Sequence, residues 1–207
     1  DRAKTISDAE ETDKLFNYKR PTAEIIDGVG YLYVFPGKDY VRHYKKIYET
    51  CGYKVTAKTP TQAQTTRAVK NALPDDMPAC DVALLGYVEA LAPGGQEWRG
   101  NDDVKWKMET INGQEVAFIG VAFSYWGNII YSVIEALSRY CSTVIYAGRL
   151  GSLTPSDTPN ATIATGDSSY VDGSLVTWNN LFKNSPLAVE GTHYTLPSVL
   201  DETAEWY

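Results

Sequence analysis

The sequence predicts an α/β domain with a mixed, largely parallel central sheet, and three observations carry this prediction. Apolar strand-like runs alternate along the chain with segments whose apolar residues recur at helical spacing, which is typical of layered α/β folds. The run "VAFIGVAF" is apolar throughout, as expected for a strand buried on both faces. Asn112-Gly113 stands between two strand-like runs and predicts a hairpin, because this pair favours a type I′ turn.

The N-terminal half holds two predicted strands and two predicted helices. "GVGYLYVFPG" (28–37) indicates a buried strand, since a β-branched and aromatic run is bounded by Gly and Pro. The segment that follows has Tyr, Val and Ile at helical spacing and a stop signal at Gly52, so we expect a helix there. Residues 61–73 are predicted to be a helix, and 80–91 a strand.

The second half continues the alternation. Residues 124–140 place five aliphatic residues on one side and predict a helix. Ser198 and Asp201 have the spacing of a capping box. The remaining predicted elements are strands at 142–148, 160–166 and 187–196 and a last helix from 198.

The composition argues against several classes of function. The chain has 207 residues and a net charge of −7, which argues against a general nucleic-acid binder. No apolar run reaches the length of a membrane span, so no membrane partner is expected. The three cysteines are widely spaced and odd in number, which predicts neither a disulfide framework nor a zinc site and favours a cytoplasmic protein. We expect a polar segment at 1–27 and one domain at 28–207.

Two loops are the candidate ligand sites, because ligands of such sheets bind beyond the carboxyl ends of the strands. In the first, "AFSYWG" (122–127), Ser124 precedes a predicted helix whose free N–H groups favour an anion or a sugar hydroxyl. The alternative is that Ser124 merely caps this helix while Tyr125 and Trp126 pack nearby.

The second loop is "AGRLGSL" (147–153). Its glycines permit positive φ or a close backbone approach, and Arg149 offers a rigid fork of donors for a carboxylate or phosphate. The alternative is a surface arginine on a turn.

From "VAFIGVAFSYWGNIIYSVIEALSRYCSTVIYAGRLGSL" onward the chain resembles the family of nucleoside phosphorylases and nucleosidases that contains uridine phosphorylase and the methylthioadenosine nucleosidases. The order and spacing of the strand-loop-helix segments carry the resemblance, which covers 115–207 well and 28–91 loosely. "TPSDTPNATIATGDSSYVDG" and "VEGTHYTLPSVLDET" resemble the later segments. The resemblance implies a three-layer α/β/α fold and cleavage of an N-glycosidic bond, by water or by phosphate.

Two departures from the family pattern matter. Tyr146 stands where phosphorylases of this family present an arginine to phosphate, which favours hydrolysis over phosphorolysis. The resemblance also implies acidic residues after "HYTLPSVLDET", and the chain ends at Tyr207 without them. Three explanations stay open: the domain is incomplete at its C-terminus, a second chain or a homo-oligomer completes the site, or the module binds without catalysis.

The leading hypothesis is therefore a nucleosidase-like enzyme acting on a nucleoside or nucleotide. No cofactor or metal is expected, apart from inorganic phosphate if the enzyme is a phosphorylase. The rival is a non-catalytic module that uses the same fold for ligand binding or interaction within a larger assembly. His193 is the candidate catalytic residue, with a structural role as its alternative. The predicted substrate-binding residues are Ser124, Tyr125, Arg149, Leu150, Gly151, His193 and Thr195.

Overall fold

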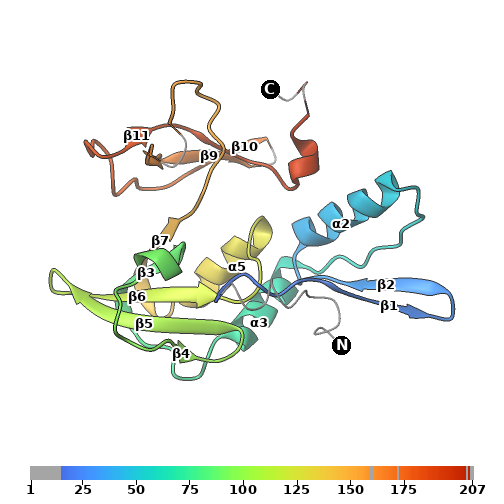
Figure 1. Cartoon of the computed structure of the whole chain (residues 1–207), viewed down its shortest axis with the longest axis horizontal. Helices are drawn as coiled ribbons and strands as arrows, with labels where there is room; N and C mark the ends of the chain where they lie inside the picture. The colour runs from blue at the N-terminus through green and yellow to red at the C-terminus, as the bar shows by residue number, and fades with distance from the viewer. Residues whose placement is uncertain (1–14, 159–160, 172, 204, 206–207) are drawn as a thin grey trace. The chain divides into compact units, whose positions relative to one another are not determined.

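The computed structural model describes residues 15–158, 161–171, 173–203 and 205, and the chain divides into two compact units (Figure 1). Unit 1 is Asp1–Gly148 and unit 2 is Arg149–Tyr207. The expected division into a polar segment at 1–27 and one domain at 28–207 stays a prediction.

A five-stranded sheet forms the centre of unit 1, in the order β4-β5-β6-β3-β7 (Figure 1). The strand β3 lies parallel to both of its neighbours, β6 and β7, whereas β5 is antiparallel to β6 and to β4. The predicted α/β class is confirmed, and the sheet is mixed in direction. Its strands are β3 (Cys80–Gly86), β4 (Arg99–Gly100), β5 (Val104–Ile111), β6 (Gln114–Val121) and β7 (Cys141–Ala147).

The hairpin between β5 and β6 forms where the sequence predicts it. Asn112 and Gly113 have φ values of 51° and 79°, so both adopt the left-handed conformation that a type I′ turn requires. The pairing is continuous from Ile111↔Gln114 to Val104↔Val121. It makes β6 an interior strand, because β3 pairs with its other edge.

Three helices pack their apolar sides into the main core of unit 1. The helix α3 (Gln62–Ala72) contacts α5 (Asn128–Leu137), and its N-terminus carries a capping box between Thr61 and Gln64. The helix α2 (Lys38–Thr50) ends before Gly52, whose φ of 86° matches the predicted stop. Among the described residues, no helix combines the length and apolarity needed to cross a bilayer.

The opposite face of the sheet carries a second, smaller core. Successive strand residues point to opposite faces, so Val116 and Phe118 leave the main core that Ala117 and Ile119 enter. Val88, from the short helix α4 (Val88–Leu91), is fully buried against them. Both faces of the sheet are therefore covered at least in part by described side chains.

The expected buried strand at 28–37 is wrong. The strands β1 (Thr22–Ile26) and β2 (Val29–Tyr33) form an exposed hairpin instead. Asp27 and Gly28 make its turn, with φ values of 52° and 76°. The β-branched and aromatic composition identified a strand, but the turn folds it back on 22–26 and leaves the side chains of 29–33 outside the core. Phe35, beyond the end of β2, is buried in the core. The predicted strand at 80–91 also ends early, at Gly86, and α4 follows it.

Unit 2 consists of short strands in two small sheets, β8 with β11 and β10-β9-β12. The strands expected at 160–166 and 187–196 are reduced to two-residue and three-residue pieces. Of the expected last helix, the described residues form a single 3-10 turn (Val199–Asp201), because Glu202 leaves helical geometry at φ −79° and ψ 71°. Residues 204, 206 and 207 of that prediction lie outside the described residues. The strands are β8 (Ala164–Thr165), β9 (Ser168–Val171), β10 (Ser174–Thr177), β11 (Val189–Glu190) and β12 (His193–Thr195).

Candidate functional site

Two tyrosines and a glycine meet at the carboxyl ends of the parallel strands of unit 1. The hydroxyl of Tyr125 accepts a hydrogen bond of 2.9 Å from the backbone N–H of Gly86, the last residue of β3. The rings of Tyr125 and Tyr146 are 6.1 Å apart and stand edge to face. Because β6, β3 and β7 run in the same direction, this group lies where ligands of open α/β sheets bind.

Gly86 is required at this position by its backbone geometry. Its φ is 93°, and a Cβ atom there would lie 2.0 Å from the backbone oxygen of Ala147 on β7. The adjacent N–H, from Tyr87, donates to that same oxygen at 2.8 Å. The turn therefore directs the N–H of Gly86 to Tyr125. Sequence reasoning missed Gly86, although a glycine closing an apolar strand was a usable signal.

Both tyrosines at this edge are neutral phenols at physiological pH. Burial raises the pKa of Tyr125, and the neighbouring Tyr146 raises it further, while the hydrogen bond from Gly86 opposes the shift. Burial also raises the pKa of Tyr146. The Tyr125 hydroxyl accepts from Gly86 and keeps its own proton as a donor for a ligand.

The alternative role considered for Ser124, as the cap of α5, is wrong. The N-cap residue is Gly127, and the carboxylate of Asp39 accepts a 2.7 Å hydrogen bond from the N–H of Asn128. The side chain of Asn128 accepts in return from the N–H of Asp39, at 3.3 Å. Ser124 instead donates to the side-chain oxygen of Asn17, at 2.5 Å. A buried carboxylate from the start of α2 thus already occupies the positive end of α5.

Trp126 packs against other aromatic side chains, which is the alternative to ligand binding that the sequence left open. Its ring stacks on Tyr40 at a centroid distance of 4.4 Å, and His43 stands edge to face with it at 5.5 Å. Within the loop 122–127, Trp126 therefore joins the aromatic side chains of α2, and Tyr125 is the residue directed to the strand ends.

The segment before β1 covers the end of β6. The N–H groups of Asn17 and Lys19 donate to the carbonyls of Val121 and Ala122, each at 2.9 Å. Lys19 also forms a 2.6 Å ion pair with Asp103. This docking explains why Asn17 reaches Ser124, the residue that we expected to bind substrate.

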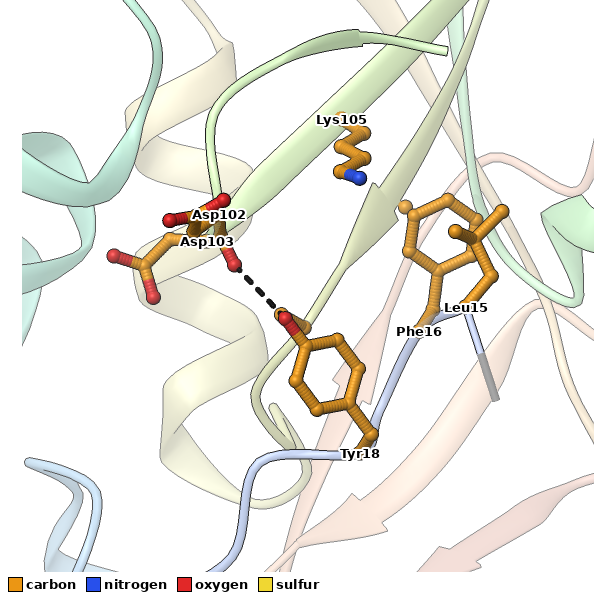
Figure 2. A pocket seen from close by; sticks show the side chains of 8 residues that line it. Leu15, Phe16, Tyr18, Asp102, Asp103 and Lys105 are labelled. Atoms are coloured by element: carbon orange, nitrogen blue, oxygen red, sulfur yellow. Dashed lines mark hydrogen bonds between the residues drawn. The ribbon is translucent and has the colours of Figure 1, made fainter. Parts of the chain in front are cut away.

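A small hollow beside this segment is lined on one side by Leu15, Phe16 and Tyr18 of the segment (Figure 2). The Tyr18 hydroxyl donates to the backbone oxygen of Asp102 at 3.4 Å, and Lys105 points into the same region. Gly120 lacks a Cβ where the Phe16 ring lies, at 2.1 Å from the place such an atom would take. We interpret this hollow as the docking site of the segment itself.

In unit 2, two of the predicted binding residues meet. The Nδ1 atom of His193 lies 3.2 Å from the hydroxyl of Ser169 and 3.3 Å from that of Thr195, and these hydroxyls are 3.0 Å apart. Pairing of β12 with β9 creates the cluster, since His193 is in register with Ser169. Ser169 was missed because it is distant in sequence. The hydroxyls fix the ring of His193, which fits the structural role weighed for it.

The protonation of His193 predicts a pH-dependent stability of unit 2. Burial lowers the pKa of His193 below its ordinary value of 6.5, so the unfolded chain binds a proton more readily than the folded unit. We expect this contribution to be complete above pH 6.5 and to be lost as the pH falls through the folded-state pKa. Hydrogen exchange of the β9 and β12 amides, corrected for intrinsic rates, should show weaker protection at pH 5.5 than at pH 7.5. An unchanged pH dependence in His193→Gln would assign the effect to another group.

The predicted residues of the second loop, Arg149, Leu150 and Gly151, are the first residues of unit 2. Leu150 is 59% exposed, and a Cβ added to Gly151 would meet no atom within 4 Å. Arg149 is also exposed. Ser124 and Tyr125 belong to unit 1, whereas Arg149, Leu150, Gly151, His193 and Thr195 belong to unit 2. Their joint role in one site stays a prediction. Among the described residues, no three His, Cys, Asp or Glu side chains are grouped to hold a metal.

Fold and site together define a mixed α/β protein with a candidate ligand site at the carboxyl edge of its parallel strands. No family model matches the chain, and no solved structure matches it. Among curated proteins it is similar to the oxidoreductase cns1 of Cordyceps militaris, with 22% identity over 233 residues. The match covers 93% of this chain and 29% of the relative, so the chain spans less than a third of that protein's length.

Proposed function

We propose that the protein binds a nucleoside or nucleotide at the carboxyl edge of β6, β3 and β7 and cleaves its N-glycosidic bond. The observation that supports this most is the group formed by Gly86, Tyr125 and Tyr146. Aromatic faces suit stacking on a base or a sugar, and the free proton of Tyr125 can be donated to a sugar hydroxyl or to the departing base. The likeness to nucleosidases in the order of segments points to the same class. It also suggests a three-layer α/β/α arrangement.

Hydrolysis is favoured over phosphorolysis. The N-terminus of α5, which would attract a phosphate, already holds the carboxylate of Asp39. Tyr146 occupies the position of the phosphate-binding arginine of phosphorylases and carries no positive charge. Water as the nucleophile needs neither group, because it brings no charge to be neutralised.

The experiment is an incubation of the full chain with a panel of nucleosides and nucleotides, with and without phosphate, followed by chromatography for free base. We expect base release without phosphate. Tyr125→Phe removes the donor and should lower kcat/KM by roughly 10-fold to 100-fold, the range for a group that donates in the transition state. Tyr131→Phe, on the exposed side of α5, is the matched control and should leave the rate unchanged. If no base is released from any substrate, or if the two variants behave alike, catalysis at this edge is excluded.

A second candidate is a binding or interaction module without catalysis, and the exposure of apolar side chains in unit 2 favours it. None of the described apolar side chains of unit 2 belongs to the buried cores, and several large ones are exposed. Exposed apolar side chains mark an interaction site where they gather into one patch. Binding of a nucleoside without release of its base would support this candidate. The exposed residues include Trp178, Leu181, Phe182 and Leu187.

An oxidoreductase activity, the one named for the Cordyceps relative, has less support from the described residues. Dinucleotide sites of open α/β folds use glycines in the turn between a strand and a helix. The turns before α4 and α5 hold one glycine each, Gly86 and Gly127, and neither turn has the Gly-x-Gly-x-x-Gly spacing of those sites. Gly28 and Gly30, which do stand two residues apart, belong to the β1–β2 hairpin. Loss of nicotinamide absorbance on incubation with a reduced dinucleotide would reverse this ranking.

A further inference from the structure

Two of the three cysteines meet at the start of neighbouring parallel strands. Cys80 is the first residue of β3, Cys141 is the first residue of β7, and the two are partners in the register. Register partners point to the same face of a sheet, and both thiols pack against the main core of unit 1. Both are free thiols and half-buried, whereas Cys51 is exposed.

We propose that Cys80 and Cys141 form a reversible dithiol–disulfide site that reacts with a low-molecular-weight disulfide such as oxidised glutathione. Partners on adjacent strands have Cα atoms about 4.8 Å apart. This separation falls inside the range of about 4.4–6.8 Å that disulfides span. Each cysteine opens its strand, so the small approach of the two Cβ atoms requires no movement of the strand interior.

The reaction balances as two thiol–disulfide exchanges. The thiolate of Cys141 attacks one sulfur of oxidised glutathione, forming a mixed disulfide and releasing one glutathione thiolate. The thiolate of Cys80 then attacks the Cys141 sulfur, which forms the Cys80–Cys141 bond and breaks the bond to glutathione. The two protons lost by the cysteines end on the two glutathione molecules released. The protein is oxidised by two electrons, and the glutathione disulfide is reduced by two.

The surroundings of the thiols set the rate of this reaction. Burial raises the pKa of Cys80 to about 11 and raises the pKa of Cys141. The contact between the two thiols raises the pKa of Cys80 and lowers that of Cys141, so it favours Cys141 as the thiol that ionises first. Because the thiolate is the reactive form, exchange is slow near pH 7 and speeds up about tenfold per pH unit while the thiols stay mostly protonated.

The cysteines lie at the opposite end of β3 and β7 from the candidate ligand site. Gly86 and Ala147 close the same two strands six register positions away, which corresponds to roughly 20 Å of strand. Oxidation therefore links the two strands without entering the tyrosine edge. By restricting the unfolded chain, the bond should raise Tm by roughly 5–10 °C.

The test uses the full chain with Cys51→Ser, which removes the exposed thiol and leaves the pair. The protein is incubated with oxidised glutathione at pH 8 and pH 9, quenched by alkylation, and analysed by intact mass and peptide mapping. The expected product has lost two hydrogens, contains linked peptides bearing Cys80 and Cys141, and reverts with dithiothreitol. It should form several times faster at pH 9 than at pH 8, because the thiolate fraction rises with pH.

A matched variant separates the pair from two independent thiols. Cys80→Ser in the same background removes the resolving thiol, so any product should be a stable glutathione adduct on Cys141. The proposal is overturned if the folded pair yields only such adducts, or if both thiols stay fully alkylatable at pH 9. The same protein unfolded in urea is the control for the oxidant, because both exposed thiols should then react with oxidised glutathione.

Discussion

Gly86→Ala is expected to destabilise unit 1 by about 3–4 kcal/mol, the upper range for a substitution that forces strain into a partly buried backbone. The residue has a φ of 93°, and its new methyl group would lie 2.0 Å from the backbone oxygen of Ala147. Neither atom can move without shifting β3 relative to β7. The N–H of Gly86 would then lose Tyr125, so nucleoside binding should be lost together with stability. Urea unfolding followed by circular dichroism measures the first effect.

Gly94→Ala is the matched control for this substitution. A Cβ at Gly94 meets no atom within 4 Å, and its φ lies outside the left-handed region. We expect its free energy of unfolding to stay within about 0.5 kcal/mol of the wild type, as for surface changes in general. Equal stability of Gly86→Ala and Gly94→Ala would contradict the described turn between β3 and α4.

Asp39→Ala should produce the second large loss of stability, about 2–3 kcal/mol of unfolding free energy. The substitution leaves a partly buried N–H of α5 unpaired, and it removes a negative charge that interacts favourably with the positive end of the helix dipole. The carboxylate is buried and accepts from Asn128 at 2.7 Å. Asp39→Asn keeps an acceptor of the same shape and loses only the charge, so it should cost about 1 kcal/mol. Thermal and urea unfolding of the two variants separate the hydrogen bond from the charge.

The same pair of variants bears on the preference for water over phosphate. If Asp39 blocks an anion site at α5, phosphate should stabilise the Asp39→Asn variant more than the wild type in thermal unfolding. An equal response of both proteins to phosphate would remove this argument for hydrolysis, while leaving the tyrosine edge untouched.

Local signals made part of the fold predictable. Asn112-Gly113 specifies a type I′ turn by itself, and Gly52 marks the end of α2 because few other residues take positive φ there. The hairpin at β1 and β2 shows the limit of such signals. Its composition identifies strands, but only tertiary packing decides whether a strand enters the core.

The contacts that build the candidate site depend on strand register and loop position. Gly86 and Tyr125 are 39 residues apart in sequence, and Asp39 and Asn128 are 89 apart. Cys80 and Cys141 looked unrelated because only the pairing of β3 with β7 brings them together. Tyr125 was predicted because it follows an apolar strand. Gly86 was a detectable candidate as well, but its contact with Tyr125 depends on the sheet order.

The most direct test of the central claim is amide hydrogen exchange of the full chain with and without a saturating nucleoside. We expect new protection at Gly86 to Val88, in the loop 122–127 and at Tyr146 to Gly148. We expect no change along the outer edge of β5, at 107–111, which serves as the internal control. Protection confined to other segments, or no protection with any nucleoside of the panel, would contradict a ligand site at the carboxyl edge of the parallel strands.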